Sequence, residues 1–149
     1  MNSLFNALDT NIILGRIDTL TAQSKPLWGK MSVSQMLAHC QQPLKVGFGE
    51  LKLKRSFAGI LFGGWAKKKF MGDGGFGKNL PTDKSFIIKG DRNFDEEKTK
   101  LTQLIKRFST DDPKGLSGET HPFFGKMTSD EWSLLSWKHL DHHLTQFGV

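Results

Sequence analysis

The chain has 149 residues, a length that predicts one domain over residues 1–149 and allows a buried core without a disulfide staple. Its single cysteine, Cys40, excludes an internal disulfide and is typical of a reducing compartment, so we expect a cytoplasmic protein. No apolar run reaches the ~18–20 residues of a membrane-spanning helix, and the first residues do not resemble a secretory signal. A mildly basic surface explains the net charge of +6, and we expect neither a nucleic-acid nor a membrane partner.

Residues 3–20 are predicted to form the first helix, because apolar residues recur there at helical spacing. Leu4, Leu8 and Ile12, each four residues apart, mark the face that we expect to be buried, and Phe5 and Ile13 widen it. The Ser-Lys-Pro run at 24–26 then breaks the helix.

The second helix carries a histidine and begins with a capping signal. Ser32 followed by Gln35 is a capping box, in which the serine hydroxyl accepts a backbone N–H and the glutamine side chain bonds back to the cap. His39 lies on the flank of the apolar stripe of this helix. Pro43 has no N–H and its ring clashes with the carbonyl of His39, so we expect the helix to kink or end there.

Residues 47–93 form the least regular part of the sequence. Two elements are expected within it, a short amphipathic helix over 55–70 and an extended segment over 84–90. So long a connection is seldom bare loop in a compact domain. We interpret it as a crossover between helix pairs that covers one end of a bundle, with its aromatic segment packed over that end.

A third long helix is predicted over 95–108, with acidic residues in its first turn and basic residues in its last, the order that suits the helix dipole. The Asp-Asp-Pro run at 111–113 is expected to end it. The last helix follows Thr128, where Glu131 completes a second capping box. Four helices with a long crossover between the second and the third predict an all-α four-helix bundle.

His139 and His143 stand at positions i and i+4 of the last helix, so both rings leave the same side one turn apart. Trp132 and Leu140 fall within the same arc, whereas Asp141 falls opposite. We therefore expect the two imidazoles to point inward. Inward-facing histidine pairs on a bundle helix are a common way to hold a metal.

Three imidazoles are thus available to an interior site, His39 from the second helix and His139 and His143 from the last. Three neutral nitrogen ligands suit Zn²⁺, and also Ni²⁺, Fe²⁺ or Co²⁺. A site with three protein ligands keeps a coordination position open, which is typical of catalysis or ligand binding rather than of a structural metal. An ion held in this way lowers the pKa of a bound water or thiol.

The remaining candidate residues have simpler interpretations. His142 is expected to be solvated, because its angle turns it toward the polar face, and His121, which precedes a proline in a loop, is expected to cap a turn. Cys40 is expected to be a buried apolar side chain rather than a ligand or a nucleophile. Asp141 faces away from the histidines and nothing places Glu50 near them, so the sequence offers no general base and the catalytic residues stay unknown.

Four motifs between Trp28 and Phe147 carry a family resemblance. They are Trp28-Gly29-Lys30-Met31-Ser32 with Gln35-Met36-Leu37 and His39, Phe86-Ile87-Ile88-Lys89-Gly90-Asp91 with Phe94 and Glu97-Lys98, His121-Pro122-Phe123-Phe124-Gly125 with Glu131-Trp132, and Lys138-His139-Leu140-Asp141-His142-His143-Leu144. These motifs resemble the DinB/YfiT-like superfamily of metalloproteins, and most closely an uncharacterised branch of it.

The resemblance implies a four-helix bundle, usually a homodimer, with one divalent metal held by three histidines. By motif position these are His39, His139 and His143. Characterised relatives are metal-dependent enzymes that act with low-molecular-weight thiols as S-transferases or isomerases, and some are hydrolases. Leu134, at a nominally exposed angle on the last helix, also indicates a partner surface.

Three hypotheses of function follow. The first is a metal-dependent enzyme, a thiol S-transferase or hydrolase, with Zn or Ni as cofactor and a small-molecule substrate. The second, motivated by the missing base, is a non-catalytic ligand-binding or interaction bundle that keeps the metal pocket. The third is a binder of anionic membrane or nucleic acid through the basic and aromatic residues at 52–69, whose binding would weaken with salt.

Overall fold

The structure is a computed structural model that describes residues 2–72, 75–80, 82–110, 116 and 120–149. Within these ranges it contains five α-helices, one 3-10 turn and no β-strand, which confirms the predicted all-α class. The elements are α1 (Ala7–Thr19), α2 (Val33–Gly47), α3 (Phe57–Met71), the 3-10 turn η1 (Lys84–Phe86), α4 (Phe94–Thr110) and α5 (Ser129–Gln146).

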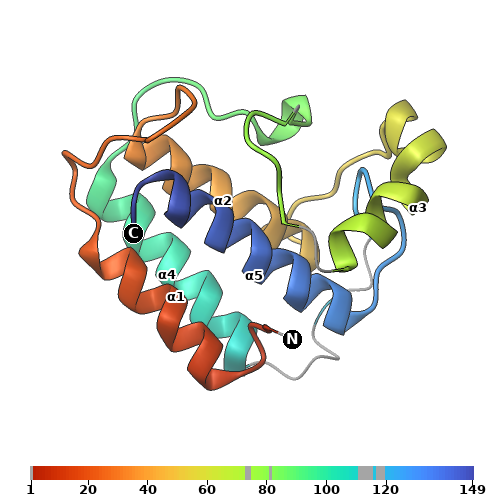
Figure 1. The fold of residues 1–149 in the computed structure, drawn as a ribbon, viewed down its shortest axis with the longest axis horizontal. Helices are drawn as coiled ribbons and strands as arrows, with labels where there is room; N and C mark the ends of the chain where they lie inside the picture. The colour runs from red at the N-terminus through yellow and green to blue at the C-terminus, as the bar shows by residue number, and fades with distance from the viewer. Residues whose placement is uncertain (1, 73–74, 81, 111–115, 117–119) are drawn as a thin grey trace.

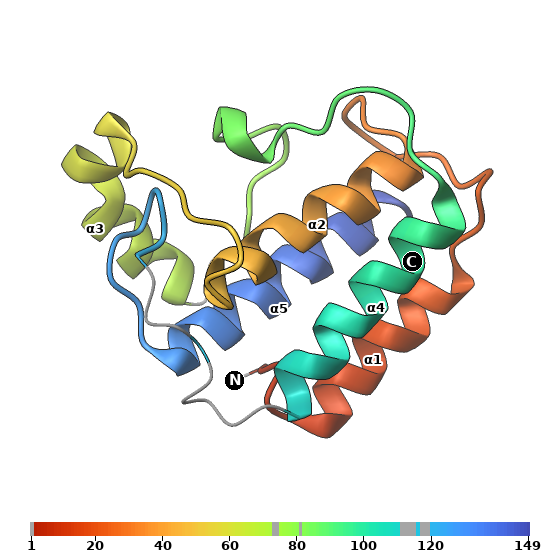
Figure 2. The same ribbon diagram turned by 180° about the vertical axis from the view of Figure 1, so that it is seen from behind.

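Helices α1, α2, α4 and α5 form the predicted four-helix bundle (Figures 1 and 2). α2 packs against α4 and α5, and α1 packs against the same two helices, so α1 and α2 occupy diagonal corners. The predicted long crossover joins α2 to α4 and contains α3 and η1. The largest fully buried side chains on the four helices are Ile13, Ile17, Met36, Leu37, Leu44, Leu101, Ile105, Phe108, Trp132, Leu140 and Leu144.

Both histidine-bearing helices begin as predicted. At α2, the Ser32 hydroxyl accepts from the Gln35 N–H at 3.2 Å and the Gln35 side chain accepts from the Ser32 N–H at 3.0 Å. At α5, the Thr128 hydroxyl accepts from the Glu131 N–H at 3.2 Å and the Glu131 carboxylate accepts from the Thr128 N–H at 2.8 Å. Because each capping box fixes the first turn, it also fixes the direction in which the histidines leave the helix.

The first helix begins later than the prediction. Asn6 is its N-cap, and the Asn6 Oδ1 atom accepts from the N–H groups of Leu8 and Asp9 at 2.8 and 3.2 Å. α1 therefore starts at Ala7 rather than at residue 3. The local signal for this start is an asparagine cap with an acidic residue in the first turn.

The predicted buried face of this helix is correct at Ile13 and wrong at Leu8 and Ile12, for the same reason. Leu4 packs into the core from outside the helix, so it does not define the helical phase. The buried face passes through Ile13 and Ile17, whereas Leu8 and Ile12 are 74 % and 54 % exposed. Leu4 precedes the cap, and counting it as a helical residue shifts the predicted apolar stripe by about one position.

α2 continues past Pro43 to Gly47, so of the two outcomes predicted at this proline, a kink or an end, the end is wrong. A proline inside a helix costs about 3 kcal/mol, because one hydrogen bond is lost and the ring crowds the preceding turn. Leu44 and Val46 lie beyond the proline and are both 1 % exposed. Burial of each of these side chains stabilises the folded state by about 1.5–3 kcal/mol, and the two together offset the cost of the proline.

The crossover helix α3 lies at one end of the bundle (Figure 1). Its small residues face the protein, since a Cβ atom on Gly59 would lie 2.7 Å from the Cα of Phe123. The expected packing of its aromatic side chains over the bundle end is wrong, because Phe57, Phe62 and Trp65 are all exposed. The close approach of the glycine face to the loop before α5 turns the large side chains outward.

The second crossover element also differs from the prediction. Lys84–Phe86 is a 3-10 turn rather than the start of an extended segment, and extended backbone begins at Ile87. Asp83 caps the turn by accepting from the N–H of Ser85 at 2.9 Å. The turn buries the Phe86 ring and directs the Phe86 carbonyl toward α2.

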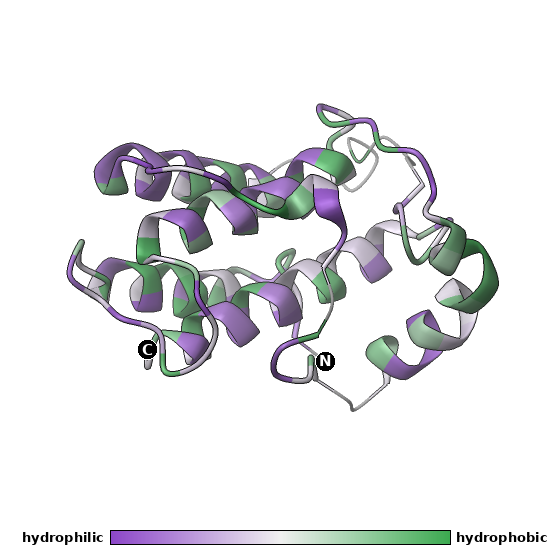
Figure 3. Ribbon diagram, turned by 90° about the horizontal axis from the view of Figure 1, so that it is seen from above, coloured by the Kyte–Doolittle hydropathy of each residue, from purple (hydrophilic) through white to green (hydrophobic). Residues whose placement is uncertain are grey.

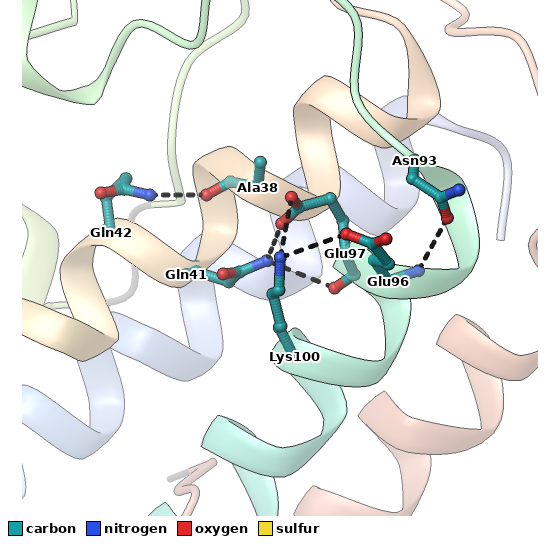
Figure 4. Close-up of polar contacts among 7 residues, drawn as sticks. All are labelled: Ala38, Gln41, Gln42, Asn93, Glu96, Glu97 and Lys100. Carbon is teal, nitrogen blue, oxygen red and sulfur yellow. Dashed lines mark hydrogen bonds and ion pairs between the residues drawn. The ribbon is translucent and has the colours of Figure 1, made fainter.

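α4 carries its acidic residues in the first turn and a basic residue in the last, as predicted, and the Asp-Asp-Pro run at 111–113 lies outside the described residues. A polar contact joins α4 to α2 (Figure 4), where the Gln41 amide donates to the Glu97 carboxylate at 2.6 Å. Lys100 pairs with the other oxygen of this carboxylate at 3.5 Å, while Gln41 and Glu97 are both buried.

Leu134 is buried at 7 % exposure, so the partner surface predicted from its angle is wrong. The crossover covers this side of α5, where Lys67 pairs with Glu131 at 2.6 Å and the Lys138 ammonium donates to the Phe70 carbonyl at 2.8 Å. None of the helices in the described ranges combines the length and the apolar character needed to cross a bilayer.

Candidate metal centre

Three histidine side chains meet between α2 and α5. His39 and His143 are buried and His139 is partly exposed, and one ligand nitrogen of each lies within 4.8 Å of the other two. The Nε2 atoms of His39 and His139 are 3.1 Å apart. The three pairs of ring centroids are separated by 4.9, 4.7 and 4.6 Å. The structure thus brings together the three residues that the sequence nominated as metal ligands.

The shortest of these separations suits two ligands of one ion. Two nitrogens bound at about 2.0–2.1 Å to the same ion at a tetrahedral angle lie about 3.3 Å apart. The observed 3.1 Å between Nε2 of His39 and Nε2 of His139 is close to that value. The donor set, three imidazoles without a thiolate, is one that divalent transition-metal ions bind.

The 3-10 turn of the crossover decides which ring nitrogen of His39 carries the proton. Its Nδ1 atom lies 2.9 Å from the carbonyl oxygen of Phe86. Because a carbonyl oxygen only accepts, Nδ1 carries the proton and donates, and Nε2 of the neutral ring presents a lone pair toward the other histidines. Backbone contacts of this kind orient a ligating imidazole and raise its basicity.

Gln146, one turn further along α5, decides which ring nitrogen of His143 carries the proton. The amide nitrogen of Gln146 donates to the carbonyl oxygen of Trp28 at 2.7 Å, which turns the amide oxygen toward His143. That oxygen lies 2.8 Å from Nδ1 of His143 and can only accept. Nδ1 therefore carries the proton, and Nε2 of His143 also keeps its lone pair for the shared space.

Burial keeps all three imidazoles neutral at neutral pH. Desolvation is the main cause that lowers the pKa of His39, His139 and His143, and it lowers that of His143 to about 3. The neighbouring imidazoles lower the three pKa values further, since a second positive charge in the group is unfavourable. The neutral imidazole is the form that binds a metal.

His142 lies at the rim of the group and outside the ligand set. Its ring centroid is 5.0 Å from that of His143, and Trp28 and Phe76 flank it at 5.8 Å each. It is half-buried, so the expected solvation is only partly correct. Phe76 also contacts His139 at 5.7 Å between ring centroids, which gives the site an aromatic rim.

The two other expectations for single residues are confirmed. His121 is a turn residue, because its Nδ1 atom accepts from the N–H groups of Phe123 and Phe124 at 3.1 Å each. Cys40 is buried against Met36, with 3.7 Å between the sulfur atoms, and burial raises the pKa of its thiol. A neutral, buried thiol is neither a ready ligand nor a nucleophile.

The histidine group contains no carboxylate among the described residues. Asp141 faces away, as predicted, and pairs with Arg16 at 2.6 Å. Glu50 pairs with Arg107 near the far end of α2. Neither carboxylate is placed to act as a general base at the histidines.

Sequence reasoning missed both groups that orient the rings of His39 and His143. Gln146 follows His143 by three residues on the same face of α5, a spacing that indicates contact between the two side chains. The carbonyl oxygen of Phe86 carried no such signal, because a backbone atom from the crossover reaches His39 only through the tertiary fold.

One protein-family model matches almost the whole chain. A family model described as "Protein of unknown function (DUF1569)" matches residues 2–148. The searches of curated proteins and of solved structures gave no match. Because the family match covers nearly the whole chain, the protein belongs to the DUF1569 family.

Proposed function

We propose that this protein is a divalent-metal protein of the DinB/YfiT-like type, in which His39, His139 and His143 hold one Zn²⁺ or Ni²⁺ ion. The observation that carries the proposal is the convergence of three neutral imidazoles, with Nδ1 of two of them engaged by fixed acceptors. Structural zinc sites are usually closed by four protein ligands, so three ligands favour a site that binds or converts a small molecule.

The chemistry proposed for the site is metal-dependent S-transfer to or from a low-molecular-weight thiol, or hydrolysis. A bound divalent ion supplies Lewis acidity, which brings the pKa of a thiol or water toward neutrality. The chain supplies the orientation, since the Phe86 carbonyl and Gln146 hold two ligand rings. Trp28 beside His142 and Phe76 beside His139 supply an apolar border to the site.

Elemental analysis of protein purified without a histidine tag tests the metal site. We expect about one equivalent of a divalent metal in the wild-type chain and near-complete loss in His39→Ala and His143→Ala. His142→Ala is the matched control, because His142 adjoins His143 but lies outside the ligand group, and it should keep the metal. Less than a tenth of an equivalent in wild type, after attempted reloading with Zn²⁺ and Ni²⁺, would contradict the proposal.

A second candidate function is a non-catalytic bundle that binds a ligand at the same metal. The absence of a carboxylate from the histidine group, among the described residues, favours it. Thiol conjugation and ester or amide hydrolysis assayed on metal-loaded protein separate the two functions. Turnover that His143→Ala abolishes and His142→Ala preserves excludes the second function, whereas full metal loading without turnover across the substrate panel favours it.

A further inference from the structure

Helix α3 exposes large apolar side chains to solvent along its outward face. Their exposed fractions run from 58 % to 76 %. Figure 3 shows mostly apolar residues along α3, the helix that lies apart from the bundle. The residues of this outward face are Phe57, Ile60, Leu61, Phe62 and Trp65. A contiguous apolar surface of this kind marks a place where something binds.

The inner side of α3 is held so that these side chains stay outward. A Cβ atom on Gly63 would lie 2.1 Å from the carbonyl oxygen of Phe123, so only glycine permits this approach. At the start of the helix, the Arg55 guanidinium donates to the Gly59 carbonyl at 2.8 Å. At its end, Lys67 pairs with Glu131 of α5 at 2.6 Å. The apolar face is therefore a fixed feature of the fold.

The charge around this face has one sign. Residues 51–72 contain six lysine or arginine residues and no aspartate or glutamate. Lys54 precedes the helix, and Lys68 and Lys69 follow Trp65 on its exposed side, and all three lysines are exposed. Exposed aromatic and leucine side chains bordered by lysines combine the two attractions that hold a protein on an anionic bilayer, burial of apolar area and charge attraction to lipid phosphates.

We propose that α3 docks the protein onto an anionic membrane surface, with Leu61 and Trp65 entering the headgroup region and Lys68 and Lys69 contacting lipid phosphates. This proposal revises the expectation that the chain has no membrane partner, and it does not depend on the metal. A second copy of the chain is a poorer occupant, because two basic faces of a chain with a net charge of +6 repel each other. Nucleic acid could stack bases on the aromatic rings, but it would leave the aliphatic side chains of Ile60 and Leu61 without a partner.

Vesicle sedimentation with the full chain tests the docking. We expect binding to phosphatidylcholine vesicles that contain about one-third phosphatidylglycerol, and weak or no binding to phosphatidylcholine alone. The double variant Lys68→Gln/Lys69→Gln should weaken partitioning by about 25-fold, since each lysine near such a surface contributes about a factor of five. Leu61→Gln/Trp65→Gln should weaken it at least about tenfold. Raised salt should reduce the binding of the wild type.

The chain offers a matched control for each variant. Leu8→Gln/Ile12→Gln removes two exposed apolar residues from α1, and Lys25→Gln/Lys106→Gln removes two exposed lysines outside α3. Both controls should bind anionic vesicles like wild type. The proposal is overturned by wild-type protein that ignores anionic vesicles at low salt, or by equal loss in the controls. It is also overturned if light scattering finds a dimer that the α3 variants convert to monomer, which would assign the face to a second copy.

Discussion

The Nε2 atoms of His39 and His139 lie 3.1 Å apart, although 100 positions separate the two residues in the chain. His39 donates its only ring proton to the Phe86 carbonyl, so its Nε2 atom brings a lone pair to this contact. Two imidazole nitrogens at this distance need either a proton or a cation between them. A shared divalent cation would join α2 to α5, and the stability of the bundle should then depend on the metal.

Removal of the metal should lower the melting temperature of the protein. A ligand present at about 1,000 times its dissociation constant stabilises the folded state by about 4 kcal/mol. For a chain of this size such a loss corresponds to a shift of about 10 °C. Thermal unfolding followed by circular dichroism, with and without EDTA, measures it. His139→Ala should melt at the same temperature in both conditions, while His142→Ala should keep the full difference.

Gln146 should control the affinity of the site without being a ligand. It accepts from Nδ1 of His143 and is itself held by the Trp28 carbonyl, so Gln146→Leu leaves the His143 ring without its orienting contact. Loss of such a partner weakens metal binding by about 10- to 100-fold. Competition with a chromophoric chelator measures the change. Gln103→Leu, at an exposed position of α4, is the control and should bind like wild type. An unchanged affinity in Gln146→Leu would contradict the assigned role.

The convergence of the three histidines was predictable from the sequence because local signals fix the direction of their side chains. Capping boxes at Ser32 and Thr128 set the phase of α2 and α5, and helical angles then turned the three histidines inward. The face of α1 was not predictable from spacing alone, since the Asn6 cap excluded Leu4 from the helix.

The outward face of α3 and the burial of Leu134 depended on tertiary contacts. The glycines of α3 press against the loop before α5, and the crossover covers the side of α5 that a free helix would expose. Neither arrangement leaves a periodic pattern in the sequence. The contact between the Phe86 carbonyl and His39 also depends on the tertiary fold, because the crossover brings the two together.

The buried carboxylate of Glu97 should stabilise the seam between α2 and α4. It accepts from the Gln41 amide at 2.6 Å, and Gln41 is 1 % exposed. Glu97→Ala leaves that amide without this acceptor, which costs about 1–3 kcal/mol of unfolding free energy. Urea denaturation measures the loss. Glu96→Ala removes an exposed neighbour that pairs with the same Lys100 and should change stability by less than about 0.5 kcal/mol. Equal effects in the two variants would refute a special role for Glu97.

His121 should make the protein sensitive to mild acid. Burial lowers its pKa to about 3, against about 6.5 in the unfolded chain. Between these values the unfolded chain binds a proton that the folded protein does not, so stability falls as the pH drops from 6.5 toward 3. One such group gives a slope of about 1.4 kcal/mol per pH unit. Urea denaturation in EDTA at several pH values measures the slope. His121→Asn should reduce it by about that amount, and an unchanged slope would contradict the assignment.

Gly29 should be needed for the metal site, although it touches no histidine in the ligand group. Its φ of +82° favours glycine, and a Cβ atom there would lie 2.6 Å from the Gln146 amide nitrogen. Gly29→Ala therefore strains the backbone by about 1–2 kcal/mol and displaces the amide that holds His143. We expect lower stability together with weaker metal binding, measured by urea denaturation and by chelator competition. Gly15→Ala is the control, since nothing lies within 4 Å of its Cβ position inside α1, and it should stabilise the protein slightly. A Gly29→Ala protein that loses stability but keeps wild-type metal affinity would separate this glycine from the site.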